Sequence, residues 1–251
     1  MIGLPARQMA AAGEALGEIT IAQRFNGPPE SSNGGYACGR LAEFVGPVAE
    51  VTLRLPPPLE KTLFVQADGF GGARLLDGES LVAEAIPVEP FELNPPATPT
   101  FEQAVEASAA HPGRGIRHVL SDCFVCSPYR AKPGDGLGVS PGSLSADPTV
   151  GSAPFHPDDS VSDNGWVKPE VVWAALDCPS YAPSVMATRR IALLGRLRAM
   201  RQREIRAGER LAAVGWTRSS EGRKHHTASA LVGEDGSMAA AAEATWIELR
   251  S

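Results

Sequence analysis

Two aspartate-glycine pairs, Asp77-Gly78 and Asp235-Gly236, each join two runs of residues that have the character of β-strands. Such a pair between strand-like runs is a strong hairpin signal, because glycine adopts the backbone conformation that a tight turn requires. Further strand-like runs and one apolar, helix-like segment precede each pair. The sequence therefore predicts two halves built on one plan, which is an internal duplication.

The predicted strands cover residues 19–25, 49–55, 60–70, 72–77 and 80–88 in one half, and 189–200, 208–219, 222–233 and 237–249 in the other. The helix-like segments, residues 36–45 and 169–177, are apolar nearly all round, which indicates buried helices. Each sheet must bury one face, and one helix per half is available to cover it. We expect an α+β chain with two antiparallel sheets, each wrapped around a buried helix: a tandem, or double, hotdog fold.

The middle of the chain has a different composition. Residues 87–112 are rich in proline, and residues 130–165 are rich in glycine, proline, serine and aspartate. This composition is typical of linkers and long loops. The expected organisation is an N-terminal hotdog half (1–95), a linker and long loop region (96–165) and a C-terminal hotdog half (166–251).

Composition excludes several classes of protein. A hydrophobic content of 43% and a charged content of 21% exclude a disordered or fibrous chain. A net charge of −6 with a pI near 5.4 argues against a nucleic-acid partner. No apolar run approaches the ~20 residues of a membrane span, and the first residues lack the apolar core of a secretory signal. We therefore expect a cytoplasmic protein with reduced thiols.

Three short motifs resemble one known group. Asn33-Gly34-Gly35-Tyr36 resembles the Gly-Gly helix start of hotdog acyl-CoA thioesterases, and residues 173–177 resemble the Ala-x-Asp helix segment of the double-hotdog acyl-CoA thioesterases. Residues 235–249 are similar to the last strand of that group. The resemblance implies an Asp–Thr–Gln set in the second half. Asp177 matches the aspartate, but the alignment puts Leu193 or Leu194 at the threonine position and Ala244 at the glutamine position.

The glycine pair that opens the first helix is a candidate oxyanion site. The first N–H groups of a helix have no partner within it, and Gly34 and Gly35 let a ligand approach them closely. The helix dipole adds positive potential there. The backbone N–H groups of Gly35 and Tyr36 are the predicted donors to a thioester carbonyl, with Asn33 and Gly34 beside the ligand. The alternative is a turn that only caps the helix.

Two carboxylates are candidate general bases. Asp177 is predicted at the end of the second helix, where apolar neighbours and the negative pole of the dipole raise its pKa. The alternative is an aspartate that forms a local turn with Ser180. Glu43 has a comparable late position in the first helix and competes for the role.

Arginines are concentrated between residues 189 and 210. Arg196 and Arg198 share strand parity and could bind the phosphates of coenzyme A. The alternative is a solvated strand face or a subunit contact. Homo-oligomer formation is left open.

Cys123 and Cys126, with His118 nearby, raise the question of a zinc site. Structural zinc needs four ligands and usually a second close pair, whereas Cys38 and Cys178 are isolated in the sequence. We expect no metal and no cofactor. A redox role and ordinary packing remain alternatives for the pair.

The leading hypothesis is an enzyme that hydrolyses acyl-CoA or a related acyl thioester. The absence of the threonine and glutamine keeps an alternative open: a non-catalytic acyl or acyl-CoA binding protein on the same scaffold. A hotdog dehydratase would require a histidine near the helix, and the sequence places none there.

Overall fold

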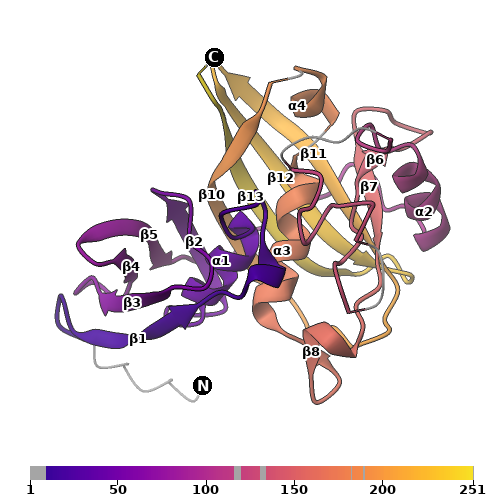
Figure 1. The fold of residues 1–251 in the computed structure, drawn as a ribbon. Coiled ribbons are helices and arrows are strands. Elements are labelled where there is room, and N and C mark those ends of the chain that lie inside the picture. Colours follow the sequence, from indigo (N-terminus) through magenta and orange to yellow (C-terminus); the bar gives the residue numbers. More distant parts are fainter. Residues whose placement is uncertain (1–9, 116–119, 131–133, 182, 189, 251) are drawn as a thin grey trace.

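The computed structural model describes residues 10–115, 120–130, 134–181, 183–188 and 190–250. Within these ranges, none of the helices has the length and apolar character that crossing a membrane requires. The main feature of the molecule is one antiparallel sheet that curves around two central helices (Figure 1).

The N-terminal half contributes five strands and one long helix. Along the chain these are β1 (Ala15–Thr20), the short helix η1 (Gln23–Phe25), α1 (Gly34–Ala42), β2 (Val48–Leu53), β3 (Thr62–Ala67), β4 (Ala73–Asp77) and β5 (Ser80–Pro87). Their order across the sheet is β1-β3-β4-β5-β2. Asp77-Gly78 forms the predicted hairpin between β4 and β5, with Gly78 at a φ of 59°.

The C-terminal half repeats this arrangement. Its elements are β6 (Gly142–Ser143), β7 (Gly151–Phe155), η2 (Asp159–Val161), β8 (Ser162–Asp163), β9 (Trp166–Val167), α3 (Pro169–Ser180), α4 (Pro183–Ala187), β10 (Ala192–Arg201), β11 (Leu211–Glu221), β12 (Lys224–Gly233) and β13 (Met238–Glu248). The order β7-β11-β12-β13-β10 across the sheet matches that of the first half. Along the chain, α1 lies between β1 and β2, and α3 lies between β7 and β10, so each helix precedes the strand that pairs with the other half. The two halves therefore share one topology.

The expectation of two separate sheets is wrong, because β2 and β10 pair with each other. Val48 to Thr52 lie opposite Met200 to Arg196 in antiparallel register, so the halves form one sheet of eleven strands among the described residues. An unpaired edge strand exposes a row of backbone donors and acceptors. Pairing β2 with β10 satisfies both rows at once and joins the halves through the backbone.

The predicted buried helices are confirmed. Residues 36–45 fall largely in α1, which begins two residues earlier, and residues 169–177 fall in α3, which extends to Ser180. The two helices pack directly against each other. A Cβ added to Gly35 would lie 2.4 Å from the Cβ of Asp177, and one added to Gly39 would lie 2.5 Å from the Cα of Glu170. Glycine at both positions allows the two helices to approach this closely.

The region expected to be a linker contains regular structure. Helix α2 (Phe101–Ala109) begins at Thr100, whose side chain accepts from the N–H of Gln103 while the Gln103 side chain accepts from the N–H of Thr100. This reciprocal capping fixes a helix that the surrounding prolines obscure in the sequence. Strand β7 also lies in this region and pairs with β11, so the sheet of the second half begins before residue 166.

Candidate active site

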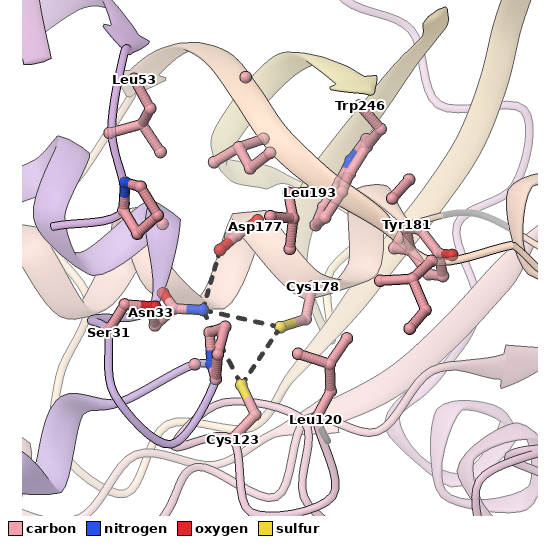
Figure 2. A pocket seen from close by; sticks show the side chains of 18 of the residues that line it. Ser31, Asn33, Leu53, Leu120, Cys123, Asp177, Cys178, Tyr181, Leu193 and Trp246 are labelled. Atoms are coloured by element: carbon pink, nitrogen blue, oxygen red, sulfur yellow. Dashed lines mark hydrogen bonds between the residues drawn. The ribbon is translucent and has the colours of Figure 1, made fainter. Parts of the chain in front are cut away.

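A cavity of about 670 Å³ lies where the two halves meet. Its lining comes from the start of α1, the last turn of α3, the loop that carries Cys123, and strands β2, β10 and β13 (Figure 2). Apolar side chains form much of this lining, and they include Leu53, Leu120, Tyr181, Leu193, Leu194 and Trp246. A cavity of this size with a few convergent polar groups is typical of a small-molecule site.

Asp177 is a buried carboxylate in this lining, and its two oxygens have different surroundings. The Oδ2 atom accepts a hydrogen bond from Nδ2 of Asn33 at 2.8 Å (Figure 2). It accepts a second one from the N–H of Gly35, also at 2.8 Å. The Oδ1 atom is buried and has no hydrogen-bond partner among the described residues. One oxygen therefore fixes the side chain, and the other is covered from solvent with its hydrogen-bonding capacity unused among the described residues.

Burial raises the pKa of Asp177 to about 7, although the hydrogen bonds from Gly35 and Asn33 act in the opposite direction and nearby Cys123 adds to the increase. A carboxyl group with a pKa near neutrality can both accept and return a proton.

Hydroxyl groups hold the end of α3. The Oγ of Ser180 donates to the backbone oxygen of Asp177 at 2.6 Å, and the Oγ of Ser229 donates to that of Leu176 at 2.6 Å. Trp246 Nε1 donates to Ser180 Oγ at 2.9 Å.

The helix does not end at Asp177 as expected, since it continues through Pro179. The turn expected with Ser180 therefore uses the Asp177 backbone, and the Asp177 side chain is directed to α1.

The start of α1 differs in detail from the predicted oxyanion site. The N–H of Gly35 donates to Asp177, and the N–H of Tyr36 donates to Oδ1 of Asn33 at 2.9 Å. Both predicted donors are thus engaged. The N–H of Gly34 has no acceptor in the part of the chain that the structure describes, and Gly34 lines the cavity. A ligand oxygen at this end of the helix would meet Gly34, with Asn33 beside it.

The structure does not bring Glu43 to Asp177. Glu43 lies at the C-terminal end of α1, where its Oε1 is 3.5 Å from Nε of Arg40. Partial burial and the nearby carboxylate of Glu170 raise the pKa of Glu43. This pair of glutamates lies at the opposite end of the helix pair, where Gly39 faces Glu170.

The predicted arginine site is also separate from the cavity. Arg196 and Arg198 alternate with Leu197, which is buried in the core, so they lie on the other face of the sheet. Arg196 is paired with Glu50 at 3.3 Å, and Arg198 with Glu243 at 3.4 Å. Strand parity correctly placed the two arginines on one face, but that face is not the one beside Asp177.

The positions aligned with the threonine and glutamine contribute no polar side chain to the cavity. Leu193 and Leu194 line it, whereas Ala244 lies opposite Leu197 and does not. Trp246, opposite Leu194, lines the cavity two residues further along β13. Asp177 therefore has no hydroxyl or amide partner from these strands.

Sequence reasoning missed two groups in the lining. The thiols of Cys123, Cys126 and Cys178 gather there with all sulfur atoms within 4.8 Å of one another, so Cys178, which is isolated in the sequence, joins the pair in the fold. His111 lines the cavity as well, with Nδ1 2.7 Å from the carbonyl oxygen of Pro141. No spacing in the sequence links Cys178 or His111 to the pair of Cys123 and Cys126. His118 lies outside the described residues.

Comparison with known proteins supports the fold. Neither a protein-family model nor a curated protein matches the chain. The structure is similar to the TesB protein MAP1729c of Mycobacterium avium subsp. paratuberculosis, with a TM-score of 0.60 and 10% identity over 95% of this chain and 96% of the other. It is also similar to the acyl-CoA thioesterase II TesB2 of Mycobacterium marinum, with a TM-score of 0.56 and 12% identity over 93% of each chain.

Two further similarities extend this comparison. The dehydratase domain of PpsC from Mycobacterium tuberculosis, solved in complex with C12:1-CoA, has a TM-score of 0.57 and 14% identity over 95% of this chain and 98% of the other. A protein of unknown function with a hot dog fold from Alicyclobacillus acidocaldarius has a TM-score of 0.52 and 9% identity over 93% of each chain. The chain therefore has a hotdog fold, with two halves of the same strand order in one polypeptide.

Proposed function

We propose that this protein hydrolyses acyl-CoA thioesters, with Asp177 as the general base. The observation that carries the proposal is the free, buried Oδ1 of Asp177 at the wall of an apolar cavity. The other oxygen is fixed by Gly35 and Asn33, so the orientation of the carboxylate is set before any substrate binds. Such preorganisation lets a base act without first rearranging its surroundings.

The proposed reaction uses two of the polar groups at the cavity, the N–H of Gly34 and the carboxylate of Asp177. The thioester carbonyl oxygen lies at the start of α1, where the N–H of Gly34 and the helix dipole stabilise the developing negative charge. Asp177 Oδ1 takes a proton from water, and the resulting hydroxide attacks the carbonyl carbon. The carbon–sulfur bond then breaks, the coenzyme A thiolate leaves, and Asp177 returns the proton to it.

The cavity and the similar structures favour an acyl thioester as the ligand. The apolar wall formed by Leu53, Leu193, Leu194 and Trp246 can bury an acyl chain. TesB2 is an acyl-CoA thioesterase and the PpsC domain was solved with an acyl-CoA, and both share the fold of this chain. These facts support the substrate class, and the position of Asp177 supports the reaction.

One observation favours a second candidate function, a non-catalytic acyl or acyl-CoA binding protein. The strand positions that the resemblance assigns to threonine and glutamine hold Leu193 or Leu194 and Ala244. The residues of β10 and β13 that line the cavity are apolar except for the indole N–H of Trp246, which is bonded to Ser180. A water beside Asp177 would then lack the second and third polar groups that the resemblance implies.

The change Asp177→Asn separates the two candidates. It preserves shape and removes the proton acceptor, so thiol release from a panel of acyl-CoAs should fall by roughly 10²–10⁴-fold. Glu43→Gln is the matched control, because it neutralises the comparable carboxylate of α1 and should leave turnover unchanged. Circular dichroism verifies that both variants fold.

Three other outcomes would contradict the proposal. Turnover that survives Asp177→Asn but is lost in Glu43→Gln would move the base to the first half. A wild-type protein that is stabilised thermally by acyl-CoA but releases no thiol would be a binding protein. Formation of an enoyl thioester from a 3-hydroxyacyl-CoA without thiol release would indicate a dehydratase instead.

A further inference from the structure

The three thiols at the cavity come from two distant segments. Cys123 and Cys126 lie on the loop between α2 and β6, and Cys178 lies in the last turn of α3. Every pair of their sulfur atoms is within 4.8 Å, and the sulfurs of Cys123 and Cys178 are 3.8 Å apart (Figure 2). The fourth cysteine, Cys38, is buried in α1 and is not part of this cluster.

The spacing of the sulfurs matches ligands that share one metal ion. Thiolates about 2.3 Å from a tetrahedral zinc ion lie about 3.8 Å from one another. A disulfide would require a separation of about 2.05 Å. Cys123 and Cys178 are thus at the separation of two zinc ligands, and Cys126 lies within reach of the same point.

The backbone around the cluster is fixed by hydrogen bonds. The N–H of Phe124 donates to the carbonyl oxygen of Asn26 at 2.8 Å, and Ser140 Oγ donates to that of Cys126 at 2.7 Å. Ser180 and Ser229 hold the helical turn that carries Cys178. Three sulfur ligands on a backbone held in this way lose little conformational freedom when a metal ion binds, which favours tight binding.

An amide donor faces two of the three sulfurs. Asn33 Nδ2 lies 3.9 Å from the sulfur of Cys123 and 3.8 Å from that of Cys178. Three neighbouring thiols can share one negative charge but cannot all ionise without a cation. A soft divalent ion removes this conflict, because it binds each sulfur as thiolate.

We propose that Cys123, Cys126 and Cys178 bind one zinc ion, with the fourth position open to the cavity for water or another small ligand. Three protein ligands with one open position is the arrangement of a zinc site that can exchange its fourth ligand. The sequence could not predict it, because the third ligand is 52 residues beyond Cys126 in the chain and close only in the fold. The proposal goes beyond the proposed hydrolysis and does not depend on it.

Zinc analysis of purified protein tests the site without any substrate. Wild type stripped with a chelator under reducing conditions and reloaded with zinc should hold about one ion per chain. Cys123→Ser, Cys126→Ser and Cys178→Ser should each lose it. Cys38→Ala is the matched control and should retain it. Asp177→Asn should also retain zinc, so loss of hydrolysis and loss of metal are separate results.

A thiol count covers the case in which a serine variant fails to fold. Zinc added to the stripped wild type should protect Cys123, Cys126 and Cys178 from alkylation. The rate of alkylation of Cys38, which is buried outside the cluster, should be the same with and without zinc. Zinc should also raise the melting temperature of wild type and leave that of the folded serine variants unchanged. Reduced wild type that takes up no zinc, or zinc retained by Cys178→Ser, would overturn the proposal.

Discussion

The N–H of Gly35 donates to Oδ2 of Asp177 at 2.8 Å, across the contact between α1 and α3. This bond joins the first half of the chain to the second inside the core. It is formed at a place where no side chain fits, because a Cβ on Gly35 would lie 2.4 Å from the Cβ of Asp177 and 2.7 Å from the carbonyl oxygen of Trp173. The same glycine therefore determines both the distance between the helices and the orientation of the carboxylate.

Gly35→Ala should separate the two helices. Alanine is intrinsically better than glycine in a helix by about 1 kcal/mol, so any loss of stability must come from the clash. We expect a net destabilisation of roughly 1–3 kcal/mol, measured by urea unfolding, together with a large loss of thiol release. Gly39→Ala is the comparison, because it clashes with Glu170 one turn away. It should lower stability by a similar amount and affect turnover much less. Equal losses of turnover in both variants would argue against a specific role for the Gly35 bond.

Asn33 has two functions that substitution can separate. Its Oδ1 caps α1 by accepting from Tyr36, and its Nδ2 donates to Asp177. Asn33→Ser keeps a capping oxygen, whereas Asn33→Ala removes it and should cost about 1 kcal/mol in unfolding free energy. Both variants lose the amide donor, so both should lower the rate of thiol release by about tenfold or more. Steady-state kinetics beside thermal unfolding distinguishes the two functions. Full activity in Asn33→Ser would show that the amide bond does not orient Asp177.

Trp246 and Ser180 form a chain of two hydrogen bonds, or relay, that ends at the backbone carbonyl oxygen of Asp177. Trp246→Phe leaves the Ser180 hydroxyl without its donor, and Ser180→Ala leaves both the indole N–H and the Asp177 carbonyl oxygen without a partner. Each single change should be destabilising because it leaves buried polar groups unsatisfied. The double variant should lose less unfolding free energy than the two single variants lose together. The difference, measured by denaturant unfolding, should be about 0.5–1.5 kcal/mol. Strict additivity would contradict the relay.

Glu248 provides a test of acid sensitivity. Hydrogen bonds from His225 and Arg190, each at 3.0 Å, lower the pKa of this carboxyl. A carboxyl with a lowered pKa stabilises the fold above its unfolded value of about 4.3, and that contribution is lost as the pH falls through the folded value. Glu248→Gln should therefore be less stable than wild type at neutral pH, and the difference should shrink below about pH 4. Urea midpoints across this range provide the measurement. A constant difference at all pH values would show that the charge of Glu248 is unimportant.

Local sequence signals predicted most of the secondary structure. The two Asp-Gly hairpins, the apolar segments at 36–45 and 169–177 and most strand-like runs are found where hydrophobic pattern and turn residues place them. The same signals could not reveal the pairing of β2 with β10, because either edge strand could equally have remained exposed. Proline-rich composition hid α2 and β7, whose stability comes from a capping box and from contact with β11.

The candidate site was only partly predictable, because it depends on contacts between distant segments. The sequence identified the glycine start of α1 and Asp177, but which N–H groups remain free follows from the Asp177 and Asn33 contacts. Strand parity grouped Arg196 with Arg198 without indicating which face of the sheet they occupy. The approach of Cys178 to Cys123 comes from packing alone.

The continuous sheet has a consequence for symmetry. A hotdog assembly made from two identical chains must build two identical composite sites, since any substitution appears in both. Here β2 and β10 belong to one polypeptide, so the equivalent ends of the helix pair can diverge independently. One end has glycine at the helix start opposite Asp177, whereas the other has Pro169 and Glu170 opposite Glu43. Because both halves belong to one polypeptide, the pairing of β2 with β10 is intramolecular and should persist at any dilution.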